Sequence, residues 1–147
     1  MTSADLGLLA PVWAGTPAAE MTGDAAFLQA MLDAEAALTR SQAALGQAPD
    51  SAATVVTAAA RAENFDVREI ALRARAGGNP VIPLVADLTA AVPADVADFV
   101  HRGATSQDIL DTAVMLVATR TVATLLSELR HTADVLGRLA EIGRAHV

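Results

Sequence analysis

The sequence of 147 residues contains no cysteine and no lysine, and aromatic residues make up only 3% of it. Without cysteine the chain can form no disulfide framework, no thiolate metal site and no cysteine nucleophile. The histidines, His101, His131 and His146, have no spacing that would place two of them on one helical face as metal ligands. We therefore expect neither a metal nor another cofactor.

Positive charge is also scarce, because 10 basic residues, all arginine, stand against 17 acidic ones and give a net charge of −7. A nucleic-acid partner is excluded on this ground, since neutralising phosphates requires a basic surface. An anionic ligand would need local donors rather than a global field. The N-terminal residues lack a basic region before an apolar core, and no charge-free membrane-spanning run is evident, so we expect a cytoplasmic protein without a membrane partner.

Hydrophobic residues are abundant, at 53%, and are mainly alanine, leucine, valine and isoleucine. This mixture favours closely packed helices, and no segment shows the alternation of a strand. The predicted fold is therefore all-α. After a loop containing Pro11, Gly15 and Pro17, we expect helices over residues 24–45, 50–62, 66–77 and 80–92, and a short helix or turn over 93–100. Asp50-Ser51, Asp66 and Asn79-Pro80 are the expected helix starts.

The last predicted helix is much longer than the others. Between Ser106 and about Ile142 there is no proline, and the glycine inside this stretch, Gly137, lies near its end, so the helix would be roughly 55 Å long. Apolar or small residues recur along it in steps of three and four, as in the seam of a helical bundle: Met115, Ala118, Val122, Leu125, Leu129, Thr132, Leu136 and Leu139. A second row widens the apolar face in the first turns: Ile109, Ala113, Leu116 and Val117. Such a helix needs partners that this chain does not supply.

Thr105 and Ser106 lie where a loop becomes this long helix. Their hydroxyls, the first free backbone amides and the helix dipole would together suit a carboxylate. Asp108 and Asp111 follow in the first turns, where the dipole favours acidic side chains. An ordinary N-cap is the alternative interpretation, because serine and threonine are common caps.

The segment around this helix start resembles the first signature region of the fumarase/aspartase superfamily. Gly103-Ala104-Thr105-Ser106-Gln107-Asp108, followed by Asp111-Thr112-Ala113, is similar to a Gly-x-Thr-Ser-x-Asp pattern with Asp-Thr-Ala shortly after it. In that family the region opens a long helix of a central bundle, and its threonine and serine bind a substrate carboxylate. The resemblance therefore implies a small N-terminal helical domain over residues 1–104 and the first long bundle helix over 105–147.

Two further stretches, 27–38 and 77–85, resemble the 3-carboxy-cis,cis-muconate cycloisomerases within the superfamily. In adenylosuccinate lyases the second stretch typically carries a substrate-contacting histidine, where this chain has Asn79 followed by Pro80. An amide donates and accepts hydrogen bonds but does not titrate near neutrality, so Asn79 would orient a substrate rather than move a proton.

His101 precedes the signature at a position where related lyases carry a histidine that approaches substrate. The resemblance thus implies that Thr105, Ser106, Gln107, Asn79 and His101 bind substrate, with His101 also a candidate catalytic residue. The alternative is that His101 is a hydrogen-bonded structural residue. His131 is expected to be a solvated surface residue, and no role is assigned to His146.

The family's other two signature regions are missing from these 147 residues, including the mobile Ser-Ser-x-Met-Pro-x-Lys-x-Asn loop that supplies the serine base. We expect an N-terminal portion that is inactive by itself. The resemblance implies lactonisation of a muconate, a small di- or tricarboxylate, in a homotetramer whose sites combine residues from several subunits. The alternatives are another superfamily lyase, acting on adenylosuccinate or argininosuccinate, and a non-catalytic helical interaction module.

Overall fold

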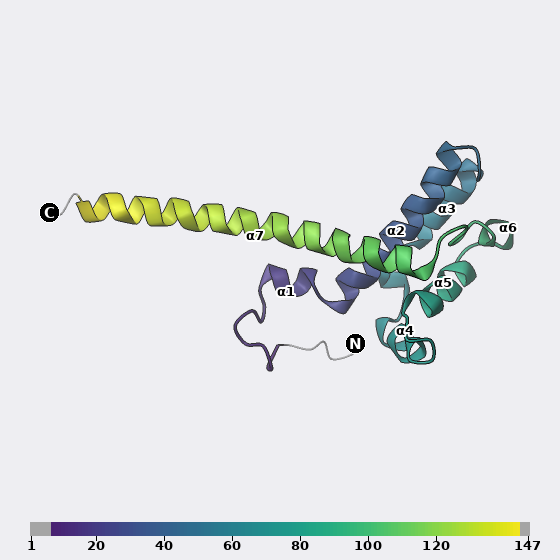
Figure 1. Ribbon diagram of the computed structural model, residues 1–147, viewed down its shortest axis with the longest axis horizontal. Helices are drawn as coiled ribbons and strands as arrows, with labels where there is room; N and C mark the ends of the chain where they lie inside the picture. The colour runs from purple at the N-terminus through teal and green to yellow at the C-terminus, as the bar shows by residue number, and fades with distance from the viewer. Residues whose placement is uncertain (1–6, 145–147) are drawn as a thin grey trace.

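The computed structural model describes residues 7–144, and this span contains helices and loops without any strand. The predicted all-α fold is therefore confirmed; His146 and residues 1–5 lie outside the described part. Figure 1 shows most helices gathered at one end of the molecule, while the last helix leaves them as a long rod. The helices are α1 (Pro17–Met21), α2 (Asp24–Ala44), α3 (Asp50–Ala59), the 3-10 helix η1 (Ala62–Asn64), α4 (Val67–Ala74), α5 (Val81–Ala90), α6 (Ala94–Ala97) and α7 (Ser106–Arg144).

Several predicted boundaries need correction. The segment expected to be a loop contains α1, which starts because the Thr16 hydroxyl accepts from the Ala19 amide and Pro17 fits the first helical position. Helix α3 ends at Ala59 rather than at residue 62, because the chain leaves helical geometry at Ala60 and then forms η1. Its N-cap is Pro49, which places Asp50 in the first turn instead of at the cap.

Other predicted helix starts are confirmed. The Asp66 carboxylate accepts hydrogen bonds from the amides of Arg68 (2.9 Å) and Glu69 (3.1 Å), so this residue caps α4 as expected. Helix α4 ends at Ala74, and turns lead from it to Gly78. Helix α5 starts after Asn79-Pro80 and ends at Ala90, two residues earlier than predicted.

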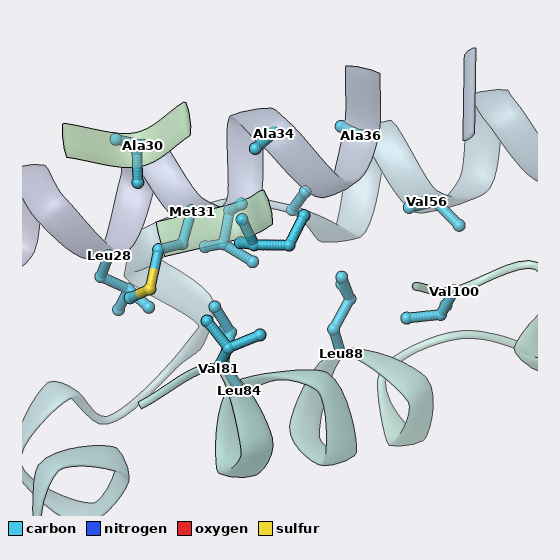
Figure 2. Packing of buried hydrophobic residues seen from close by; sticks show 14 of the residues in the cluster. Leu28, Ala30, Met31, Ala34, Ala36, Val56, Val81, Leu84, Leu88 and Val100 are labelled. Atoms are coloured by element: carbon cyan, nitrogen blue, oxygen red, sulfur yellow. The ribbon is translucent and has the colours of Figure 1, made fainter. Parts of the chain in front are cut away.

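The core lies between α2 and the helices around it. Leu32 of α2, Val56 of α3 and Leu84 of α5 are fully buried, and in Figure 2 Val81, Leu84 and Leu88 extend from α5 toward α2. Small side chains on α2, such as Ala30, keep the helices close together. Each fully buried leucine contributes about 1.5–3 kcal/mol through removal of apolar surface from water.

Helix α7 has two apolar rows with different surroundings. In its first turns Ile109 and Ala113 are buried in the core, and Leu116 and Val117 pack against that core while half-buried. The predicted seam row is exposed, with Met115 at 63%, Leu129 at 64% and Leu136 at 60%. The second row therefore joins α7 to the compact end of the molecule, formed by α2 to α6. The large apolar side chains of the seam stay exposed within residues 7–144, although α1 also contacts α7, where the Thr124 hydroxyl lies 3.2 Å from Sδ of Met21.

Helix α7 is also long and apolar enough, by length and composition, to cross a membrane. The sequence analysis did not single it out for this property. Core helices of soluble proteins satisfy the same two conditions when they are mostly buried, whereas only 11% of the apolar window of α7 is buried within the described residues.

Candidate carboxylate-binding site

An acidic side chain fixes the start of α7. The Asp108 carboxylate accepts a hydrogen bond from the Thr105 amide (3.0 Å), while the Asp108 amide donates to the Thr105 carbonyl (3.0 Å). This is the carboxylate half of a capping box, in which the side chain three residues into the helix reaches back to the cap residue. Asp108 therefore stabilises the turn that carries Thr105 and Ser106.

Because Asp108 does this, the two neighbouring hydroxyls are left free. Neither the Thr105 nor the Ser106 hydroxyl makes a hydrogen bond within the described span, and the amides of Ser106 and Gln107 have no acceptor there either. Thr105 is exposed and Ser106 is half-buried. The ordinary N-cap interpretation of these hydroxyls is therefore not what the structure shows. Two hydroxyls and two amides remain available at the positive end of a 39-residue helix.

Gln107 is partly engaged with its own helix. Its side-chain amide donates to the Asp111 carboxylate one turn later (2.7 Å), so only its side-chain carbonyl is without a partner among residues 7–144. Asp111 in turn lines an open hollow of about 380 Å³ along α7, together with Thr112, Met115, Leu116 and Thr119. Gln107 thus lies at the head of a shallow hollow rather than inside a closed pocket.

Asn79 lies on a different loop, between α4 and α5. Its side-chain oxygen accepts from the Val81 amide (2.8 Å), which caps α5 and leaves the side-chain NH₂ group available. The loop is held at its base by an ion pair between Arg73 of α4 and Asp87 of α5, with one N–O distance of 2.9 Å. In the part of the chain that the structure describes, no hydrogen bond joins Asn79 to the start of α7.

His101 has a partner that the sequence analysis missed. Its Nδ1 lies 2.6 Å from Oε1 of Glu35, and Glu35 is 0% exposed in the middle of α2. Burial raises the pKa of Glu35 above its ordinary value, and the hydrogen bond and electrostatic interaction with His101 act in the opposite direction. An available signal was the acidic residue itself, since Glu35 occupies a helical row that otherwise consists mainly of apolar residues such as Met31 and Leu32.

Four of the five predicted site residues thus lie in the stretch 101–107: His101 in the turn before α7, Thr105 directly before the helix, and Ser106 and Gln107 as its first two residues. Asn79 is the exception. His131 is exposed on α7, as predicted. The arrangement offers donors for an anion at the helix start and an imidazole two residues before Gly103, which is sufficient for binding and orienting a carboxylate.

Comparisons with known proteins give a consistent result. A family model described as "Lyase" matches residues 15–145. The chain is 49% identical over 144 residues to nitrosuccinate lyase from Streptomyces davaonensis, which covers 96% of this chain and 30% of that protein. It is 42% identical over 132 residues to 3-carboxy-cis,cis-muconate cycloisomerase from Bradyrhizobium diazoefficiens, which covers 88% of this chain and 29% of the relative.

The fold agrees with a solved relative. The crystal structure of 3-carboxy-cis,cis-muconate lactonizing enzyme from Pseudomonas putida superimposes with a TM-score of 0.74 at 36% identity, over 76% of this chain and 26% of that one. The chain therefore spans about 30% of the length of the curated relatives that it matches.

Proposed function

Because the chain belongs to the lyase family of the fumarase/aspartase superfamily, we propose that the start of α7 binds a carboxylate of a small di- or tricarboxylate substrate. The observation that carries this proposal is the pair of free hydroxyls, with two free amides, at Thr105, Ser106 and Gln107. These donors form one part of an active site in the whole protein.

The chemistry places a specific demand on such a site. Adding a group to a double bond beside a carboxylate, or eliminating one, builds negative charge on the carbon next to that carboxylate. The carboxylate shares the charge, so donors that already point at its oxygens stabilise the transition state without reorganising. Hydroxyls and amides at the start of a rigid helix meet this requirement, since the helix dipole adds partial positive charge at the same place.

The first reaction we propose is the cycloisomerisation of 3-carboxy-cis,cis-muconate. A carboxylate oxygen of the substrate adds to one carbon of a double bond, the neighbouring carbon takes up a proton, and a lactone forms without a leaving group. The likeness to proteins named for this reaction supports it, in sequence and in structure. This assignment places the protein in the catabolism of aromatic compounds.

A second reaction is favoured by one observation, the 49% identity to a nitrosuccinate lyase. Here a proton would leave the carbon beside a carboxylate, nitrite would leave the adjacent carbon, and a double bond would form. Both reactions need the same carboxylate-binding donors, so the geometry at Thr105 and Ser106 serves either.

Adenylosuccinate or argininosuccinate cleavage is a less favoured assignment. An adenylosuccinate lyase from Methanothermobacter thermautotrophicus is 33% identical over 140 residues. Asn79, whose side chain caps α5, stands where those lyases typically carry a histidine, and an amide cannot exchange a proton near neutrality.

We further propose that the whole protein is a soluble, cytoplasmic homotetramer with composite sites. The exposed seam of α7 supports an assembly, since an apolar row of this length is stabilised by burial against other helices. The serine base would come from the Ser-loop region of the family, which these 147 residues do not contain. Residues 1–147 alone are therefore proposed to be inactive.

The test uses a full-length enzyme that carries these residues and compares turnover of 3-carboxy-cis,cis-muconate, nitrosuccinate and adenylosuccinate. Turnover of either of the first two supports the corresponding reaction, and turnover of adenylosuccinate alone overturns both proposed reactions. Absence of turnover with all three and with argininosuccinate would favour the helical interaction module.

The role of Ser106 is tested in the same enzyme. Ser106→Ala should lower kcat/KM by about 5- to 150-fold, equivalent to about 1–3 kcal/mol for a lost hydrogen bond to a charged group. Ser127→Ala, an exposed serine farther along α7, is the matched control and should leave kcat/KM unchanged. An unchanged kcat/KM in Ser106→Ala would remove this hydroxyl from the site.

A further inference from the structure

We propose that Glu35 is a positioning residue that holds the His101 ring with its proton on Nδ1, so that Nε2 is the nitrogen presented to a ligand at the start of α7. Thr39 and Gln42 hold the backbone around it. This inference rests on the proposed function for the ligand's identity, but its structural part is independent of it.

Side chains on one face of α2 contact the segment that carries His101. Glu35, Thr39 and Gln42 follow one another at steps of four and three, so their side chains lie on the same side of the helix. The Thr39 hydroxyl lies 3.2 Å from the carbonyl of Glu35 on its own helix and 3.4 Å from the Phe99 carbonyl, so its proton is shared between these two acceptors. The Gln42 amide donates to the Arg102 carbonyl at 2.6 Å. The backbone on both sides of His101 is therefore tied to the helix that also carries its carboxylate partner.

The backbone of His101 itself is held in an uncommon conformation. Its φ is +54°, in the left-handed region where glycine is the usual residue, and the nearby Gly103 has φ +76°. A side chain in this region is strained and persists only where the surrounding contacts impose it. Glycine or asparagine would make the same turn more easily. Histidine is among the residues that adopt this conformation more often than most, so it is the contact of its ring with Glu35 that points to a role for the imidazole.

The pair formed by Glu35 and His101, called the dyad below, is not arranged for maximum stability. Oε2 of Glu35 is buried and has no hydrogen-bond partner within the described residues, and the His101 side chain keeps only 18% exposure. A buried carboxylate with one oxygen unpaired is expensive, and an apolar residue of similar size commonly serves stability as well or better. We therefore infer that Glu35 positions His101 rather than stabilising the core.

A carboxylate that accepts from one imidazole nitrogen fixes the tautomer and the orientation of the ring. With Nδ1–H directed at Oε1 of Glu35, the opposite nitrogen, Nε2, makes no hydrogen bond in the described span. His101 lies four residues before Thr105, in the turn that leads to the start of α7. Nε2 is thus available to contact an anion bound at the helix start, as a donor once it takes up a proton.

The structural part is tested on the 147-residue chain by long-range ¹H–¹⁵N NMR of the histidine rings at neutral pH. The wild-type His101 ring should show its proton on Nδ1, and in Glu35→Leu this preference should be lost. Asp33→Leu removes a neighbouring carboxylate of α2 that pairs with Arg120 (2.6 Å) instead, so it should leave the His101 spectrum unchanged. A wild-type ring protonated on Nε2 would overturn the proposal whatever the enzyme does.

Thermal unfolding separates positioning from a structural role. If Glu35 serves His101 rather than the fold, Glu35→Leu combined with His101→Leu should melt at the wild-type temperature or above it, because replacing both partners of a buried pair by apolar residues is often neutral or stabilising. Glu35→Leu alone leaves the largely buried Nδ1–H of His101 unpaired and should melt at a lower temperature. A marked fall in the Tm of the double variant would mean that the Glu35–His101 pair holds the fold, and this would overturn the proposal.

The functional part is tested in the full-length enzyme. Glu35→Leu and His101→Ala should each lower kcat/KM at least tenfold, and the double variant should lose no more than the worse single one, because both changes remove the same interaction. Additive losses, or full activity in Glu35→Leu, would show that the dyad does not act as a unit. Ser106→Ala reports on the carboxylate site separately, so failure of the dyad and failure of the proposed function give different results.

Discussion

The compact end of the molecule and the far part of α7 are rich in the same apolar residues, yet these residues have opposite surroundings. Leu32 and Leu84 in the compact end are 0% exposed, whereas Leu136 and Leu139 on α7 are 60% and 58% exposed. Helical periodicity is strong in both regions, but only the compact end has neighbouring helices within this chain (Figure 1). The comparison shows that an apolar pattern determines a helix, whereas its burial depends on what is packed beside it.

The candidate site lies at the boundary between these regions. Ile109 and Ala113 anchor the first turns of α7 in the core, directly after the free donors of Thr105 and Ser106. The donors are therefore held rigidly from one side, while the remainder of the helix is available for association. A site that opens from this boundary is suited to completion by other helices.

The largest expected effect is the loss of unfolding free energy when a buried leucine, rather than an exposed one, is shortened. Leu84→Ala should reduce the free energy of unfolding by about 2–5 kcal/mol, because it leaves a cavity in the core. Leu136→Ala, the matched change on the exposed seam, should alter it by less than about 0.5 kcal/mol. Urea unfolding followed by circular dichroism measures both. Equal losses would mean that the two regions are not as different as their exposures indicate.

Charged residues introduced on the seam should weaken self-association without lowering the folding stability of the chain. Leu125→Arg combined with Leu129→Arg should leave the urea midpoint of the chain unchanged and weaken self-association at least about tenfold, or about 1.4 kcal/mol. Sedimentation velocity over a concentration series measures the association. Ser127→Arg with His131→Arg places the same two charges off the seam and is the control. If both double variants associate equally well, the seam is not the contact surface.

The free energy of unfolding should depend on pH through Glu35, the buried acidic residue in the core. The pKa of Glu35 is raised by burial from its ordinary value of 4.5, so the unfolded chain releases this proton at a lower pH than the folded one. Its contribution to stability is thus fully present below pH 4.5 and is lost as the pH rises through the raised pKa.

Glu35→Gln does not titrate, so relative to it the wild type should lose stability as the pH rises above 4.5. Urea unfolding at several pH values measures this difference. His101→Ala should steepen the loss, because the hydrogen bond that opposes the raised pKa is removed. Parallel curves for the wild type and Glu35→Gln would contradict the assignment.

The smallest expected effect concerns the ion pair that closes the Asn79 loop. Arg73 and Asp87 keep 45% and 30% side-chain exposure, so Arg73→Ala should lower the urea midpoint only slightly, and by less at high salt. Arg138 forms no ion pair within residues 7–144, so Arg138→Ala is the control on the rod. Urea unfolding at two salt concentrations distinguishes them; a loss that does not respond to salt would point to packing rather than charge.

Local signals in the sequence predicted much of this architecture. The proline-free stretch after Ser106 predicted α7, and the Asp66 cap predicted the start of α4, because both depend on neighbouring residues. The short helix α1 was missed, since Pro17 and Gly15 indicate a loop as readily as a helix start.

The start of α7 was predicted as a donor-rich turn, but its details depend on contacts that spacing does not reveal. Asp108, rather than Thr105 or Ser106, supplies the cap. The Glu35 partner of His101 is 66 residues away in sequence, and no periodic pattern links the two. Its charge in an apolar row was visible, but its burial and its partner became apparent only in three dimensions.

The anchoring of α7 in the core limits the insertions and deletions that this helix can accept. Ile109 and Ala113 fix the angular phase of the helix against the core, and the seam continues from that phase as far as Leu139. Inserting a single residue after Ala113 would turn everything beyond it by about 100°, because an α-helix has about 3.6 residues per turn. An insertion of seven residues restores the phase to within about 20°. Insertions and deletions in this helix should therefore be tolerated best at lengths close to a whole number of turns, such as about seven, eleven or eighteen residues.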